Sequence, residues 1–131
     1  MGSKHSVRFD VRFRDTDAMG HVNNAVFATY LESVRINWYN SLEQSKIPEM
    51  ILARLEIDYK LPIKIEHKIQ VDMWVSKIGT KSWTFEYEIM DYTNNQTFAI
   101  AKTVIVCYDY KEHRSIPIPE FMKSEVEKLV I

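Results

Sequence analysis

One long segment of helical periodicity, set between segments of strand periodicity, limits what this chain can fold into. Apolar side chains recur at steps of three and four from Phe27 to Leu42, which predicts a helix of about five turns with one apolar face. No proline interrupts this pattern before Pro48. Because no other predicted element is long enough to cover a sheet, we expect the helix to pack against the strands in an α+β fold.

The flanking segments alternate apolar and polar residues, as strands with one buried face do. Short turns at residues 79–80 and 91–96 join the last three segments, which predicts an antiparallel meander. The first segment would bury Phe13 together with the apolar residues that precede it. A proline at residue 119 suits the start of a short helix over residues 120–130. The expected strands are residues 7–13, 52–59, 69–76, 83–90 and 98–110.

Composition narrows the function classes. At 131 residues the chain is expected to form a single domain, residues 1–131. A net charge of −1 without a basic stripe argues against a nucleic-acid partner, and no apolar run is long enough for a membrane span. Only three glycines are present, which excludes a glycine-rich nucleotide loop. The single cysteine, Cys107, and the absence of a signal-peptide pattern favour the cytoplasm.

The polar segment from Asp15 to Asn24 is the strongest candidate for chemistry. It places two carboxylates, a glycine, a histidine and two asparagines between a strand end and a helix start. Unpaired amides at a helix start can stabilise an oxyanion, and a nearby carboxylate can attack a carbonyl or activate water. Gly20 would allow a sharp turn. These are the parts that an acyl-transfer site needs.

Simpler interpretations remain open for the same residues. Asp and Asn before a helix are common caps, and Asn23 or Asn24 would cap this one. Asp15 is expected to fix the loop, and His21 would be an ordinary surface residue. Cys107 lies in an apolar strand and is expected to be a buried, inert thiol. No pair of histidines has the spacing of metal ligands, so no metal site is expected.

Several motifs resemble those of one known family. Residues 11–24 read VRFRDTDAMGHVNN, which resembles the opening motif of the 4-hydroxybenzoyl-CoA thioesterase-like family. The strings YLESVR, YKLP, KIGTKSW and IPIP fit its continuation in order, at residues 30–35, 59–62, 77–83 and 116–119. The likeness covers nearly the whole chain. It implies a hotdog fold, in which a curved antiparallel sheet of about five strands wraps a long helix.

The resemblance also implies roles for individual residues. Asp17 matches the catalytic aspartate, acting as nucleophile or as general base on the thioester of an acyl-CoA or an acyl-carrier protein. The backbone amide near Asn24 matches the group that polarises the carbonyl. His21 and Asn23 match polar positions lining the site. The prototype enzyme lacks this histidine, so the chain resembles the acyl-CoA and acyl-carrier branch. Family sites lie between subunits, which implies a homodimer or homotetramer.

Substrate contacts and competing functions complete the expectations. No cofactor is expected beyond the coenzyme A of the substrate. A hotdog hydratase or dehydratase and a non-catalytic acyl-CoA binding protein are the alternatives to a thioesterase. Cations near the Gly79 turn are candidates for the CoA phosphates, against the alternative of simple solvated charge. Aromatic residues of the helix are candidates for the acyl wall, against the alternative of core packing. The candidate substrate-binding residues are Asn23, Phe27, Tyr30, Lys77, Lys81 and Ser82.

Overall fold

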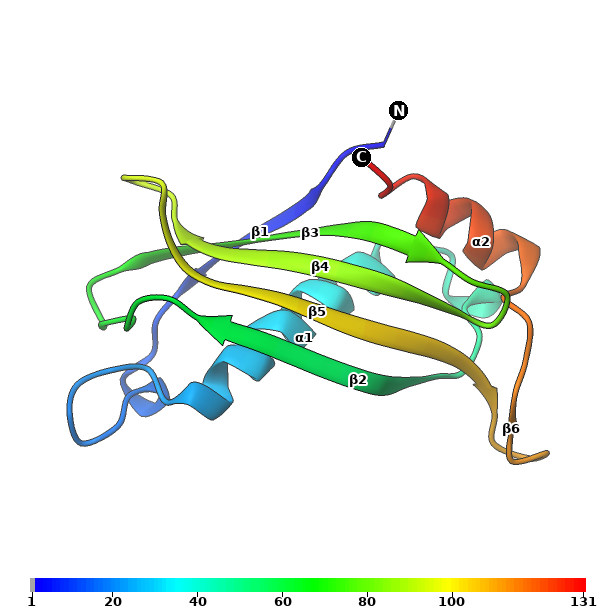
Figure 1. Ribbon diagram of the computed structural model, residues 1–131, viewed down its shortest axis with the longest axis horizontal. Helices are drawn as coiled ribbons and strands as arrows, with labels where there is room; N and C mark the ends of the chain where they lie inside the picture. Colours follow the sequence, from blue (N-terminus) through cyan, green and yellow to red (C-terminus); the bar gives the residue numbers. More distant parts are fainter. Residues whose placement is uncertain (1) are drawn as a thin grey trace.

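The computed structural model describes residues 2–131, in which one antiparallel sheet forms the main body (Figure 1). Its strand order is β1-β3-β4-β5-β2, and the two-residue strand β6 pairs with β5. The hairpins β3–β4 and β4–β5 confirm the predicted meander. The strands are β1 (His5–Asp10), β2 (Met50–Tyr59), β3 (Lys68–Ile78), β4 (Ser82–Asp91), β5 (Gln96–Asp109) and β6 (Arg114–Ser115).

The long helix α1 (Asn24–Asn40) crosses one face of this sheet (Figure 1). Its apolar stripe is buried, with α1 packed chiefly over β1 and β3, and Trp38 also meets Phe85 of β4 edge to face at a centroid distance of 5.6 Å. The predicted stripe is thus confirmed, although the helix ends before Leu42 with Ser41 as its C-cap. The curved sheet around a long helix confirms the expected hotdog fold.

Two smaller elements close the ends of the structure. The short helix α2 (Glu120–Glu127) begins after Pro119, as predicted, and its buried Met122 and Val126 extend the core. A backbone hydrogen bond from the Val75 amide in β3 to the Leu129 carbonyl connects the C-terminal segment to the sheet. Neither helix in the described residues has the length and apolar character needed to cross a membrane.

The prediction of a strand over residues 7–13 was wrong in its last part. Strand β1 ends at Asp10, and Phe13, expected inside, is 83% exposed. The cause is Asp15, whose carboxylate accepts a hydrogen bond from the Arg12 amide at 2.9 Å while its own amide donates to the Arg12 carbonyl. These bonds curl the chain into the 3-10 turn η1 (Phe13–Asp15), so the alternating pattern no longer follows a pleat.

Strand β2 is an edge strand whose inner face is largely uncovered. It pairs with β5 on one side only, and α1 packs chiefly over β1 and β3. Leu52, Leu55 and Tyr59 share the inner face but are 47%, 40% and 46% exposed. Ile36 on α1 is 48% exposed beside them. An apolar strip and a free backbone edge therefore lie together on this side of the molecule.

Candidate active site

Asp15 anchors the loop that precedes α1. Its carboxylate is 2% exposed and accepts hydrogen bonds from the Arg12 amide and from the Tyr30 hydroxyl at 3.0 Å, while the Arg12 guanidinium lies 3.1 Å away. Burial alone raises the pKa of Asp15, but the bonds from Arg12 and Tyr30 outweigh it and bring the pKa below its ordinary value. All of these contacts are internal, which matches the loop-fixing role expected of Asp15.

Asp17 has a different environment. It is exposed, and its Oδ1 accepts hydrogen bonds from the amides of Met19 at 2.8 Å and His21 at 3.2 Å. Gly20 makes this turn possible with a φ of 79°, as the sequence suggested. Among residues 2–131 no donor contacts Oδ2. The turn therefore orients the carboxylate through one oxygen and leaves the other available.

The first turn of α1 supplies backbone donors. Asn23 is the N-cap, and its side chain accepts a hydrogen bond from the Ala25 amide at 2.9 Å. The Asn23 carbonyl accepts from Val26 at 2.8 Å. The amide of Asn24 has no acceptor among the described residues, and it lies at the positive end of the helix dipole. This amide can donate to a bound carbonyl oxygen.

A pocket of about 270 Å³ brings these groups together. The C-terminal end of β2 and the segment after it form the opposite wall, where the Tyr59 hydroxyl donates to the Asn24 carbonyl at 3.0 Å. The Tyr59 ring also meets Phe27 edge to face at 4.9 Å. Four residues proposed from the sequence therefore share one pocket: Asp17, His21, Asn24 and Phe27.

The other candidate residues lie elsewhere in the chain. Asn23 caps the helix and does not line the pocket. Tyr30 is 4% exposed, with its hydroxyl bonded to Asp15 and its ring stacked on Phe9. Lys77, Lys81 and Ser82 lie around the β3–β4 turn, at the end of the sheet opposite the loop before α1 (Figure 1). Within one chain these three residues are remote from Asp17.

Tyr59 is one of five lining residues that sequence reasoning missed as site residues, the others being Val22, Lys60, Leu61 and Pro62. Its exposed place at the end of an edge strand carries no chemical signal, and only the packing of β2 beside the start of α1 brings its hydroxyl to Asn24. Cys107 shows no sign of a catalytic role. It is buried in β5, and burial raises the pKa of its thiol to about 11.

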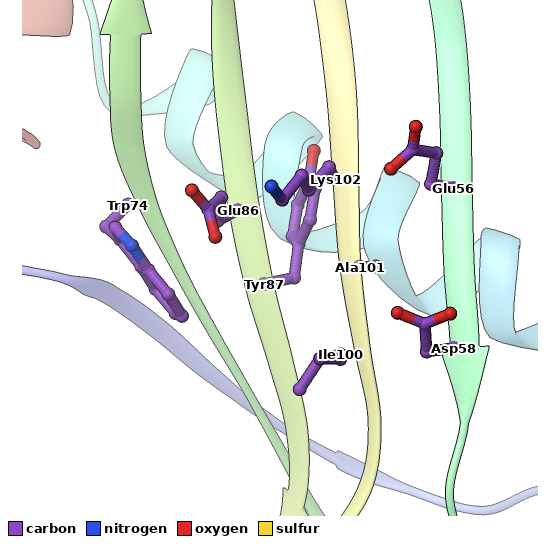
Figure 2. Close-up of a pocket in the computed structure, with 8 residues that line it drawn as sticks. All are labelled: Glu56, Asp58, Trp74, Glu86, Tyr87, Ile100, Ala101 and Lys102. Atoms are coloured by element: carbon purple, nitrogen blue, oxygen red, sulfur yellow. The ribbon is translucent and has the colours of Figure 1, made fainter.

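A second hollow, also about 270 Å³, lies on the sheet face away from α1 (Figure 2). Glu56, Glu86 and Lys102 cross this face on neighbouring strands, with Trp74 beside them. The floor of this hollow consists of strand residues, and no helix begins among the residues that line it. Its chemistry is that of a mixed-charge surface, and the pocket at Asp17 is the better candidate for acyl transfer.

Comparison with known proteins places the chain in a family. The profile of the Thioesterase-like superfamily matches residues 11–126, which include the Asp17 loop, α1 and strands β2 to β6. The chain belongs to the Thioesterase-like superfamily. Within it, a Haemophilus influenzae acyl-CoA thioesterase, YbgC, is 26% identical over 126 residues, covering 91% of each protein. The uncharacterized Bacillus subtilis protein YsmA is 29% identical over 83 residues, covering 61% of this chain and 56% of that protein.

Solved structures of the superfamily have the same fold. A Thermus thermophilus thioesterase, complexed with coenzyme A and Zn, is 33% identical and superposes with a TM-score of 0.83, covering 95% of this chain and 92% of that one. A 1,4-dihydroxy-2-naphthoyl-CoA thioesterase from Synechocystis superposes with a TM-score of 0.87 at 21% identity, covering 97% and 98%. Both likenesses extend over nearly the whole hotdog fold.

Proposed function

We propose that this protein hydrolyses the thioester of an acyl-CoA or of an acyl-carrier protein. The observation that carries the proposal is the presence of an available carboxylate oxygen, on Asp17, and an unpaired helix-start amide, on Asn24, in one pocket. Relatives named as acyl-CoA thioesterases support the same reaction class. An acyl-acyl carrier protein thioesterase from Arabidopsis thaliana, 27% identical over 131 residues, supports the carrier-protein alternative.

The proposed chemistry uses the two groups in different ways. The thioester carbonyl oxygen accepts a hydrogen bond from the Asn24 amide, which stabilises the oxyanion as the carbonyl carbon becomes tetrahedral. Asp17 either removes a proton from the water that forms the new C–O bond or forms a C–O bond itself. In the second case, loss of the thiolate leaves an anhydride on Asp17, which water hydrolyses to the free acid and the original carboxylate. The C–S bond breaks, and the thiolate leaves and takes up a proton. His21, at the rim, is within the same pocket as the reacting carbonyl.

A second copy of the chain completes this site in our proposal, joined through the free edge of β2. Edge strands offer unpaired backbone groups, and this one adds the exposed apolar strip of Leu52, Leu55 and Tyr59. Antiparallel pairing about a two-fold axis near the middle of β2 sets the Met50 end of one strand opposite the Tyr59 end of its partner. Burying this strip would exclude water from both pockets.

The same symmetry gives the remote cations a role. Ile51 and Ser82 both pair with Val106, so the β3–β4 turn lies at the Met50 end of the sheet. Two-fold pairing therefore brings this turn of one copy towards the Asp17 pocket of the other. Lys77, Lys81 and Ser82 would then bind the phosphates of coenzyme A, or of the carrier-protein arm, across the subunit boundary.

Thiol release from a panel of acyl-CoAs and acyl-carrier proteins tests the reaction. We expect release of free thiol by the wild-type protein and loss of release in Asp17→Asn, with the circular dichroism spectrum unchanged. Hydration of enoyl-CoAs without thiol release would favour the hydratase alternative. Tight acyl-CoA binding without any turnover would favour a binding protein, and either result would overturn the proposal.

Subunit mixing tests the shared site. Asp17→Asn and the double variant Lys77→Glu/Lys81→Glu are each expected to have low kcat/KM as homodimers. After random exchange about half of the dimers would be mixed, and each mixed dimer would hold one intact site of its two. The kcat/KM of the mixture should therefore recover to about one quarter of the wild-type value. Asp17→Asn mixed with wild-type protein of equal concentration is the control, because its activity should stay at about one half of the wild-type value whether or not subunits exchange. Activity that never exceeds the mean of the two variants would contradict a site shared between copies.

A further inference from the structure

Arg35 is a buried cation without a buried anion. It lies on the inner side of α1, is 7% exposed, and its Nη1 donates to the Tyr87 hydroxyl at 3.2 Å. That hydroxyl also contacts Oγ1 of Thr103 at 2.6 Å. Among residues 2–131 no carboxylate lies within 4.0 Å of the guanidinium. A charge withdrawn from water in this way normally has a paired anion or several acceptors.

The buried neighbours of Arg35 in the described residues supply dipoles but no negative charge. Burial raises the pKa of Tyr87 and that of Tyr39, so both phenols stay neutral at physiological pH. Thr103 is fully buried and contributes a hydroxyl. The guanidinium is a planar fork with several N–H donors, and among the described residues only the Tyr87 hydroxyl accepts a hydrogen bond from it. Its remaining donors are available to something that enters from outside.

A pocket of about 190 Å³ gives access to this group. Apart from Arg35 its lining is mostly apolar, with Glu32 as an exposed carboxylate at the rim. Apolar cavities of about 150 Å³ accommodate a benzene molecule, so the space suits the end of an acyl chain or a ring. The other lining residues are Ile36, Tyr39, Met50, Ile51, Leu52 and Ile105.

The pocket is well placed for an acyl group that is bound at a catalytic pocket. It opens at the Met50 end of β2, on the uncovered side between α1 and that strand. In the two-fold dimer this end lies opposite the Tyr59 end of the partner, where the partner's catalytic pocket lies. The apolar inner face of β2 leads into the pocket at its Met50 end, which suits the methylene part of an acyl chain.

We propose that this pocket receives the far end of the acyl group, and that Arg35 selects acyl groups carrying an oxygen acceptor there. The inference rests on the proposed function and adds the substrate class. A carboxylate or a hydroxyl would fill the free N–H donors of the guanidinium, whereas a terminal methyl would leave them unpaired in a closed pocket. The negative charge of Glu32 at the rim would repel an acyl carboxylate but not an acyl hydroxyl. Acyl groups that end in a carboxylate and acyl groups that end in a hydroxyl are therefore tested separately.

The test compares matched medium-chain acyl-CoAs ending in methyl, hydroxyl or carboxylate. Dissociation constants are measured by calorimetry on Asp17→Asn, so that binding is read without turnover, and kcat/KM is measured on the wild-type enzyme. We expect oxygen-ended acyl-CoAs to bind about ten- to a hundredfold more tightly than the methyl-ended one. In Asp17→Asn/Arg35→Met this ratio should fall to about one, and Arg35→Lys should recover part of it.

A matched control variant and two further outcomes distinguish a failure of the role proposed for Arg35 from a failure of the proposed function. Lys123→Met removes an exposed cation on α2 and should leave the ratio unchanged. Equal binding of all three acyl-CoAs by the Asp17→Asn protein overturns the role of Arg35 even if Arg35→Met fails to fold, while thiol release by the wild type would preserve the proposed function. If no acyl-CoA binds or is hydrolysed, the proposed function fails and this inference fails with it.

Discussion

Asp15 and Asp17 lie in the same loop, but the structure gives the two carboxylates opposite surroundings. Asp15 is 2% exposed and is held by Arg12 and Tyr30, whereas Asp17 is exposed and accepts bonds only from two amides of its own turn. The contrast shows that neighbouring carboxylates in one loop can differ in role, one stabilising the loop and the other being available for a reaction. A carboxylate whose acceptors are all occupied holds the loop in place, and a carboxylate with one free oxygen beside an unpaired amide can react.

The largest expected effect is on the catalytic side of this comparison. Asp17→Ala should lower kcat/KM for acyl-CoA hydrolysis about 10³-fold, because it removes the group that we propose to attack the carbonyl or to activate water. Its free energy of unfolding in urea should change little, since the side chain is exposed and contacts only its own turn. A large loss of stability would make Asp17 a second anchor and remove the distinction from Asp15.

The opposite pattern is expected for Asp15→Ala. The substitution leaves the buried Tyr30 hydroxyl and the Arg12 amide without their acceptor, so the free energy of unfolding should fall by about 2 kcal/mol. The protein that remains folded should retain most of its kcat. Urea denaturation together with active-site titration would check both, and a loss of kcat without loss of stability would contradict the anchoring role.

Smaller effects are expected from the partners of the loop. Tyr30→Phe removes one hydrogen bond to Asp15 and should cost about 1 kcal/mol of unfolding free energy. The double variant Tyr30→Phe/Asp15→Ala should lose less unfolding free energy than the sum of the losses in the two single variants, because both substitutions remove the same hydrogen bond. Fully additive free energies from urea denaturation would mean that this bond contributes nothing.

The pH dependence of stability is expected to be the smallest effect. The pKa of Asp15 is lower in the folded protein than its ordinary value of 3.8, so the folded state binds fewer protons than the unfolded state near that pH. The stabilisation from Asp15 is therefore present above about pH 4 and is lost as the pH falls through the folded pKa. Urea unfolding from pH 6 to pH 2 should show the wild type and Asp15→Ala converging in acid.

Much of the fold was predictable from periodicity. The stripe of α1 and the alternation of β3, β4 and β5 depend on which face each residue buries, and these faces came out as expected. Phe13 did not, because its pattern continued the strand while the side chain of Asp15 turned the backbone. The pairing of β2 with β5 across the meander is likewise a tertiary outcome that no local pattern carries.

The candidate site was predictable in part. The residues of the loop and the helix start are contiguous in sequence, so a single motif contains Asp17, His21 and Asn24, which also share the pocket. Tyr59 and Arg35 could not be found in that way. Their importance depends on what lies opposite them, the start of α1 for Tyr59 and the buried Tyr87 hydroxyl for Arg35.

A crystal structure of the protein with a ketone analogue of an acyl-CoA, in which a methylene replaces the thioester sulfur, would test the proposed reaction geometry most directly. We predict that the ketone oxygen lies about 3 Å from the Asn24 amide nitrogen and that the free oxygen of Asp17 faces the carbonyl carbon. A ketone bound in the outer hollow beside Lys102, or in the pocket with its oxygen away from Asn24, would contradict the assignment.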